Sequence, residues 1–77
     1  MEDLLAYLVR SLVDEPEGIE VEAFEEDDGT VVLEIHVPEG DAGKVIGRGG
    51  RTAAALRTVM KACAVRHGER VLVDVVA

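Results

Sequence analysis

The segment that most restricts the fold of this chain is Gly47-Arg48-Gly49-Gly50, which places three glycines in four residues between two segments of helical character. Glycine adopts left-handed backbone conformations without steric cost, so this segment predicts a sharp turn from one helix into the next. Two better-known glycine motifs are excluded. A P-loop needs lysine and then serine or threonine directly after its last glycine, and a dinucleotide fingerprint must connect a strand to a helix.

The residues before this turn predict one helix and a β-hairpin. Apolar residues recur at helical spacing from Glu2 to Val13, and Pro16 then prevents the helix from continuing. Apolar and polar residues alternate over 19–23 and again over 30–37, which indicates two strands with one face in water. The Asp28-Gly29 pair between them is typical of a tight hairpin turn.

The remaining residues predict two helices and a closing strand. Asp41 is expected to cap a short helix that ends at about Ile46, just before the glycine turn. A longer helix follows from Arg51 to His67, and residues 70–76 are rich in β-branched side chains, as strands are. In the long helix four residues recur at core spacing: Leu56, Val59, Met60 and Cys63.

This order of elements predicts an α+β fold in which a three-stranded sheet carries helices on one face. A chain of 77 residues buries too little apolar surface to be divided into two stable parts. We therefore expect residues 1–77 to form a single domain. Within it, residues from about 30 to 77 form the core with the glycine turn, and residues 1–29 add a leading helix and strand.

Charge is distributed very unevenly along the chain. The net charge of −8 argues against a polyanionic partner when it is taken as a whole. Residues 1–43 carry fourteen acidic side chains and one basic side chain, whereas residues 44–70 carry seven basic side chains and one acidic side chain. The glycine turn thus lies in a basic region, and the acidic run at 25–28 is expected to repel phosphates.

Bare backbone beside a helix N-terminus attracts anions, because free N–H groups and the helix dipole are exposed there. Cations on both sides of the turn can reach phosphates, and neighbouring apolar side chains can support bases. The candidate nucleic-acid-binding residues are Lys44, Val45, Ile46, Gly47, Arg48, Gly49, Gly50 and Arg51. Farther along the long helix, Arg57, Lys61 and Arg66 form either a phosphate-binding stripe or a solvated surface.

Ile46-Gly47-Arg48-Gly49-Gly50 resembles the GXXG signature of the KH domain, which holds about four nucleotides by their backbone. With the leading helix and strand, the order α-β-β-α-α-β resembles the type II KH arrangement. Residues 43–62, GKVIGRGGRTAAALRTVMKA, are similar to the KhpA family of bacterial single-KH proteins. The chain departs from that family at Gly49, where a polar residue is usual, and at Thr52, where isoleucine is usual.

The resemblance implies non-catalytic binding of single-stranded RNA. It also implies a role as an RNA chaperone or post-transcriptional regulator that acts with a KhpB-like (Jag-like) KH protein and affects cell shape and cell-wall synthesis. The alternative is a protein–protein interaction module, a homodimer or heterodimer, in which RNA binding is secondary. Only one aromatic residue, Phe24, lies near the expected sheet and could stack on bases. Phe24 also interrupts the strand alternation, which suggests a bulge.

Catalytic, metal and membrane functions find no support in the residues. His36 and His67 lie on different elements without a neighbouring cysteine, so neither a metal site nor a nucleophile–base pair is predicted, and no cofactor is expected. Cys63 is the only cysteine, which excludes an internal disulfide. The acidic start and the absence of a long apolar run predict a cytoplasmic protein without a membrane span.

Overall fold

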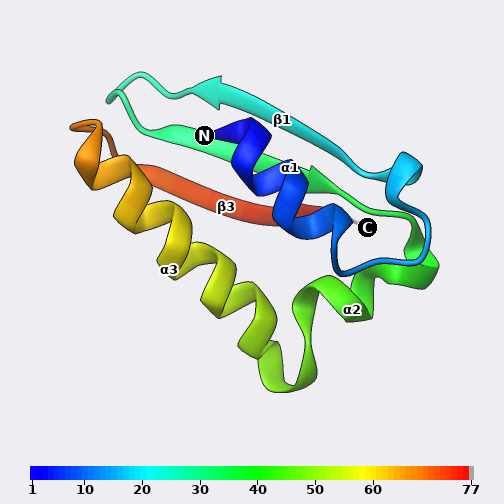
Figure 1. Ribbon diagram of the computed structural model, residues 1–77. Helices are drawn as coiled ribbons and strands as arrows, with labels where there is room; N and C mark the ends of the chain where they lie inside the picture. Colours follow the sequence, from blue (N-terminus) through cyan, green and yellow to red (C-terminus); the bar gives the residue numbers. More distant parts are fainter. Residues whose placement is uncertain (77) are drawn as a thin grey trace.

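The computed structural model describes residues 1–76 and contains the six expected elements in the expected order (Figure 1). They are α1 (Glu2–Arg10), β1 (Glu20–Glu25), β2 (Val31–His36), α2 (Ala42–Ile46), α3 (Arg51–Arg66) and β3 (Val71–Val76). Single 3₁₀ turns precede β1 (Pro16–Gly18), α2 (Glu39–Asp41) and α3 (Arg48–Gly50). The order α-β-β-α-α-β is that of a type II KH fold.

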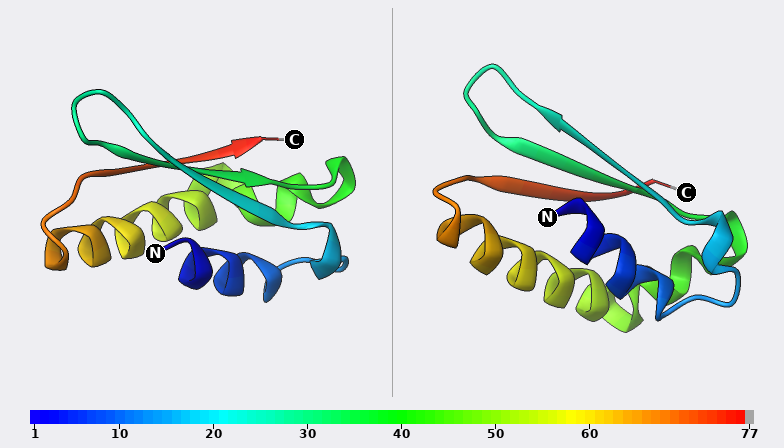
Figure 2. Two further views of the ribbon diagram at one scale, coloured as in Figure 1. Left: turned by 90° about the horizontal axis from the view of Figure 1, so that it is seen from above. Right: turned by 45° about the horizontal axis from the view of Figure 1, so that its top comes forward.

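The three strands form one mixed sheet in the order β1-β2-β3. The hairpin pairs β1 with β2 in antiparallel fashion, and β2 pairs with β3 in parallel, with Leu33 opposite both Ala23 and Val73. Parallel neighbours require a crossover connection, and here the crossover consists of α2, the glycine turn and α3. All helices lie on one face of the sheet, which confirms the predicted two-layer α+β architecture (Figure 2).

The hydrophobic core fills the space between this face and the helices. Leu33 and Ile35 of β2 pack against side chains of α1 and α3, and both are almost completely buried. The residues of the core are Leu5, Val9, Ile19, Leu33, Ile35, Val37, Val45, Leu56, Met60 and Val73. Because α3 and β3 both contribute to this core, their relative position is fixed, and the surface between them is held in place.

Three local predictions are wrong. Phe24 forms no bulge, since it stays in register opposite Val32 and β1 continues to Glu25. Asp41 precedes α2, but its carboxylate forms no capping bond and instead accepts a hydrogen bond from the backbone N–H of Glu15 at 3.3 Å. The first helix ends at Arg10, three residues early, where the Ser11 hydroxyl bonds to the carbonyl of Tyr7 and competes with the helical ladder.

The predicted core face of α3 is correct in part. Leu56 and Met60 are buried, whereas Val59 is 46% exposed and Cys63 is only half-buried. Val59 instead lines a shallow apolar groove between α1 and α3, together with Leu8 and Leu12. The helix turns its core face toward the sheet, and a residue at the edge of that face remains in contact with solvent.

No helix within residues 1–76 combines the length and the apolar character that crossing a membrane requires.

Candidate nucleic-acid interface

The glycine turn adopts backbone angles that L-residues rarely adopt. Gly47, Gly49 and Gly50 all have positive φ, with φ/ψ of 76°/169°, 63°/19° and 76°/13°. One backbone bond, from the N–H of Gly50 to the carbonyl of Gly47 at 3.1 Å, closes the turn. Glycines let the chain reverse here without a side chain to cover the backbone.

Gly47 has a second reason to be glycine. A Cβ atom at this position would lie 2.3 Å from the Thr52 Oγ1 and 2.9 Å from the Thr52 backbone nitrogen, which leaves no room for it. A Cβ at Gly49 or Gly50 would meet nothing within 4 Å. Gly47 therefore packs the turn against the first turn of α3, whereas the backbone of Gly49 and Gly50 is open to a ligand.

Arg48 and Arg51 are exposed on either side of this open backbone. Among residues 1–76 no carboxylate lies within ion-pair distance of either guanidinium. Both also lie at the N-terminus of α3, a helix of 16 residues, where the partial positive charge of the dipole favours anions. These features together would favour a phosphate group placed at the turn.

Lys44 is placed differently from these two arginines. Its ammonium group donates a hydrogen bond to the carboxylate of Asp14, and a second carboxylate, that of Asp41, lies 3.9 Å away. The hydrogen bond to Asp14 is the main cause that raises the pKa of Lys44 above its ordinary value. Lys44 is therefore held by a carboxylate of the segment that follows α1 and, unlike Arg48 and Arg51, is not free to pair with another anion in this arrangement.

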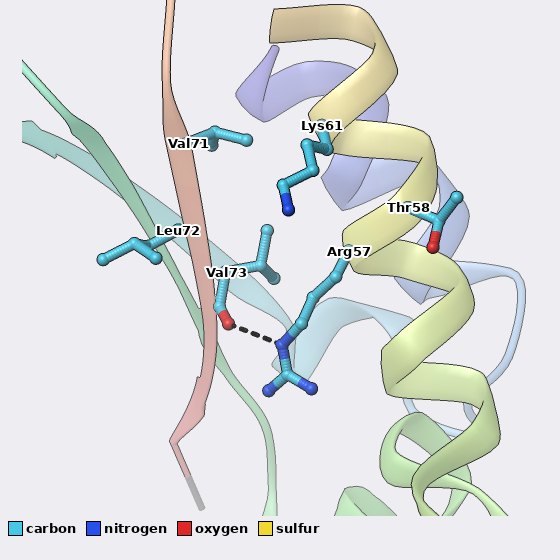
Figure 3. Close-up of a pocket in the computed structure, with 6 residues that line it drawn as sticks. All are labelled: Arg57, Thr58, Lys61, Val71, Leu72 and Val73. Atoms are coloured by element: carbon cyan, nitrogen blue, oxygen red, sulfur yellow. Dashed lines mark hydrogen bonds between the residues drawn. The ribbon is translucent and has the colours of Figure 1, made fainter.

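A groove of ≈ 180 Å³ runs between α3 and the free edge of β3 (Figure 3). Arg57 and Lys61 extend from α3 toward the strand, and the Arg57 Nε donates a hydrogen bond to the carbonyl of Val73 at 3.2 Å. Val71 and Val73 form part of the strand side of the groove. The groove thus combines two cations with an apolar wall, an arrangement suited to a strand that carries phosphates and bases.

Acidic side chains of the β1–β2 hairpin turn, Glu26 and Asp28, line a neighbouring pocket that shares Lys61, Val71 and Leu72 with this groove. The Arg70 guanidinium lies 3.6 Å from the Asp28 carboxylate and also donates to the Asp28 carbonyl at 3.2 Å. A hydrogen bond from the backbone N–H of Thr30, at 2.9 Å, is the main cause that lowers the pKa of Asp28 below its usual value. Arg70 is thus paired, whereas among residues 1–76 no carboxylate lies within ion-pair distance of Arg57 or Lys61.

The structure divides the predicted site residues into two groups. Lys44, Arg48, Gly49 and Arg51 are exposed at the turn, and Ile46 is 41% exposed beside it. Gly47 and Gly50 are partly covered, and the Val45 side chain is completely buried in the hydrophobic core. Val45 therefore supports the turn from below, and the prediction that its side chain contacts bases is wrong.

Sequence reasoning missed the contribution of β3 and misplaced the aromatic ring. Phe24 lies on β1, at the opposite edge of the sheet from β3, so no aromatic side chain among residues 1–76 lines the α3–β3 groove. The spacing of Arg57 and Lys61, four residues apart on one helix, was the signal for the groove. This spacing does not reveal that β3, which begins ten residues after Lys61, lies opposite both side chains.

Comparison with known proteins gives a consistent result. Residues 2–75 match the family model described as KhpA/KhpB, KH domain. The protein named RNA-binding protein KhpA of Clostridium perfringens is 42% identical over 99% of this chain and 100% of its own length. Proteins of the same name from Borreliella burgdorferi (38% identical, covering 95% of this chain and 88% of the relative) and Chlamydia trachomatis (37%, covering 97% and 95%) are also similar. The chain therefore belongs to the KhpA/KhpB family of KH-domain proteins.

Proposed function

We propose that this protein binds single-stranded RNA without catalysis, as one KH domain. The sugar-phosphate backbone lies over Gly49 and Gly50 and is held by Arg48 and Arg51. The strand then continues along the α3–β3 groove past Arg57 and Lys61. Ile46 and Val71 offer aliphatic contacts to the bases, and Lys44 joins once it leaves Asp14.

One observation carries this proposal: positive-φ backbone and two exposed arginines lie at the N-terminus of α3, the helix whose Arg57 and Lys61 line the α3–β3 groove. Aliphatic contacts discriminate poorly among bases, so we expect modest sequence preference. The residues that would bind are Lys44, Ile46, Gly47, Arg48, Gly49, Gly50, Arg51, Arg57 and Lys61. In the cell we propose a role as an RNA chaperone or post-transcriptional regulator in the cytoplasm, with a KhpB-like (Jag-like) partner and an effect on cell shape and wall synthesis.

The second candidate is an interaction module in which RNA binding is secondary. The apolar groove between α1 and α3, lined by Leu8, Leu12, Ala55 and Val59, favours this candidate, because it offers a second copy or another KH protein an uncovered apolar surface. The two functions use different surfaces and are therefore separable by mutation.

The test is the double variant Arg48→Asp/Gly49→Asp, assayed by fluorescence anisotropy with a labelled oligouridylate of about eight nucleotides. Aspartate tolerates the left-handed conformation of Gly49 better than most residues do, so the fold should be retained. The matched control is Gly40→Asp/Arg66→Asp, which changes the net charge equally at exposed positions away from the turn and the groove.

We expect the turn variant to lose RNA binding by about a hundredfold and the control to stay within about threefold of the wild type. Sedimentation equilibrium of the same proteins reports self-association. If RNA affinity survives in the turn variant, the RNA-binding proposal is wrong. If RNA binding and self-association are lost together, the turn belongs to a protein interface and the second candidate is favoured.

A further inference from the structure

Within residues 1–76, no helix covers the face of the sheet that points away from α1, α2 and α3 (Figure 2). Leu33 and Val73 point toward the helices and are buried, so their neighbours in each strand point to the opposite side. The strand register arranges these outward residues in rows that cross all three strands. The composition of each row determines what this surface can bind.

The central row is entirely acidic. Glu22 of β1 lies opposite Glu34 of β2, and Glu34 lies opposite Asp74 of β3. Like charges directly opposite each other destabilise a sheet. No lysine or arginine of residues 1–76 contacts these three carboxylates, and only His36, 3.5 Å from Glu34 and 3.8 Å from Glu22, lies near them. The row is thus an uncompensated line of negative charge.

An apolar row runs beside it. Phe24 lies opposite Val32, and Val32 lies opposite Leu72. Phe24 and Leu72 are 47% and 57% exposed, and Val32 is covered because it lies between them. Val76, on the other side of the acidic row, is 38% exposed. Large exposed apolar side chains grouped in this way are typical of interaction surfaces.

We propose that this outer face of the sheet docks a cationic amphipathic helix of a partner protein. Its apolar side would cover Phe24 and Leu72, and its lysines or arginines would neutralise Glu22, Glu34 and Asp74. Both rows cross the strands, so such a helix lies across the sheet. Three strands spaced about 4.8 Å apart span about 10 Å, which about seven helical residues cover, and a helix about 10 Å in diameter covers two adjacent rows.

The negative charge of this face favours a cationic helix over RNA, an anionic membrane or a second copy of the chain. RNA and anionic membranes would be repelled by the acidic row. A second copy of this chain would place two acidic rows against each other, so self-association through this face is disfavoured. Leu72 also lines the α3–β3 groove, so RNA bound there and the helix share the edge formed by β3, whereas Phe24, Glu22 and Glu34 do not line the groove.

The probe is a synthetic peptide of about fourteen residues with leucines at helical spacing i, i+3, i+4 and i+7 and lysines elsewhere. Its control has the same composition with the leucine stripe scrambled. Titration into ¹⁵N-labelled protein, followed by NMR, reports both affinity and location. We expect a Kd of about 10–100 µM at low salt, because the contact area is small, with chemical-shift changes at Phe24, Glu34 and Asp74.

The decisive variant is Glu22→Gln/Glu34→Gln/Asp74→Asn, compared with Glu2→Gln/Glu17→Gln/Glu39→Gln, which removes the same charge from exposed positions elsewhere. The face variant should lose at least tenfold in affinity and the control less than threefold. The face variant should also be as stable as the wild type or more stable, because a repulsive row is removed. Phe24→Thr should weaken binding severalfold without changing RNA affinity.

Three outcomes would overturn the proposal. The first is no saturable binding of the striped peptide at concentrations up to about ten times the expected Kd. The second is an equal loss in the face variant and the charge-matched control. The third is a set of shift changes confined to the α1–α3 or α3–β3 grooves.

Discussion

Two surfaces of this small protein carry opposite charge. The turn and the α3–β3 groove expose Arg48, Arg51 and Lys61, whereas the outer face of the sheet exposes carboxylates in register across three strands. The net charge of −8 describes neither surface. A polyanion interacts with the field near its path, and ions screen charges more than about 8–10 Å away at physiological salt. The local arrangement of charge thus determines the class of partner each surface accepts.

The first prediction separates two cations of the same helix. Lys61 faces the α3–β3 groove, whereas Arg66, also exposed on α3, lines neither groove. Lys61→Glu should weaken binding of single-stranded RNA about tenfold, since a phosphate contact is replaced by repulsion, and Arg66→Glu should change it less than about twofold. Anisotropy titrations at one salt concentration measure both. Equal losses would mean that α3 acts only through its overall charge.

The second prediction concerns the rigidity of the turn. Gly47→Ala should lower the free energy of unfolding by about 2–3 kcal/mol, because φ is positive and the methyl group collides with Thr52. Gly43→Ala, in α2 with open space around it, should leave the free energy of unfolding unchanged or raise it by up to about 1 kcal/mol. Urea unfolding of both variants gives the values. A neutral Gly47→Ala would show that the turn does not pack on α3 as described.

The salt dependence of RNA binding tests how far the basic surface extends. With about three phosphates contacted, log Kd against log salt should have a slope of magnitude near 2 for a single strand. Affinity should then fall about fifteenfold between 50 and 200 mM salt. A slope of magnitude above about 5 would require a much larger cationic surface than the turn and groove provide.

A smaller effect is expected at Lys44. Asp14→Asn should strengthen RNA binding about two- to fivefold, because the lysine no longer leaves a carboxylate to reach a phosphate. Asp3→Asn, on the exposed side of α1, removes the same charge without touching Lys44 and serves as the control. Equal affinities for the two variants would show that Lys44 takes no part in binding.

The smallest effect is on acid stability at the hairpin. The pKa of Asp28 is lowered in the folded protein, so its carboxylate stabilises the fold above the unfolded value near 3.8, and this contribution disappears as the pH falls through the folded pKa. Asp28→Asn should thus lower Tm by about 1–2 °C at pH 7. The difference should shrink as the pH falls below 3.8 and vanish below the folded pKa of Asp28. A difference in Tm that persists at such low pH would show that the effect comes from the asparagine amide and not from the loss of the charge.

The fold could be predicted from the sequence almost completely, because each element has a clear period and a clear end. Glycine and proline separate the segments. Residues 71–76 are rich in valine, which favours a strand, and this strand pairs with β2. The wrong details have local causes. Asp41 bonds to Glu15, 26 residues away, and such a distant partner leaves no local pattern.

The candidate site could be predicted only in part. The turn is a continuous segment, so its residues could be named directly. The groove joins Arg57 to Val73, which are sixteen residues apart, and the release of Lys44 depends on Asp14, thirty residues before it. Val45 is buried because it lies on the side of α2 that packs against the core. A helix of only five residues shows no apolar periodicity, so this side could not be identified from the sequence.

The most direct test of the contrast between the two surfaces is an NMR titration of the ¹⁵N-labelled protein with unlabelled oligouridylate of about eight nucleotides. The amide signals of residues 44–51, of Arg57 and Lys61, and of 71–73 should shift together and saturate with one Kd. The signals of Glu22 and Glu34, on the outer face, should stay unchanged. Shifts centred on that acidic face, with the turn unaffected, would contradict the account.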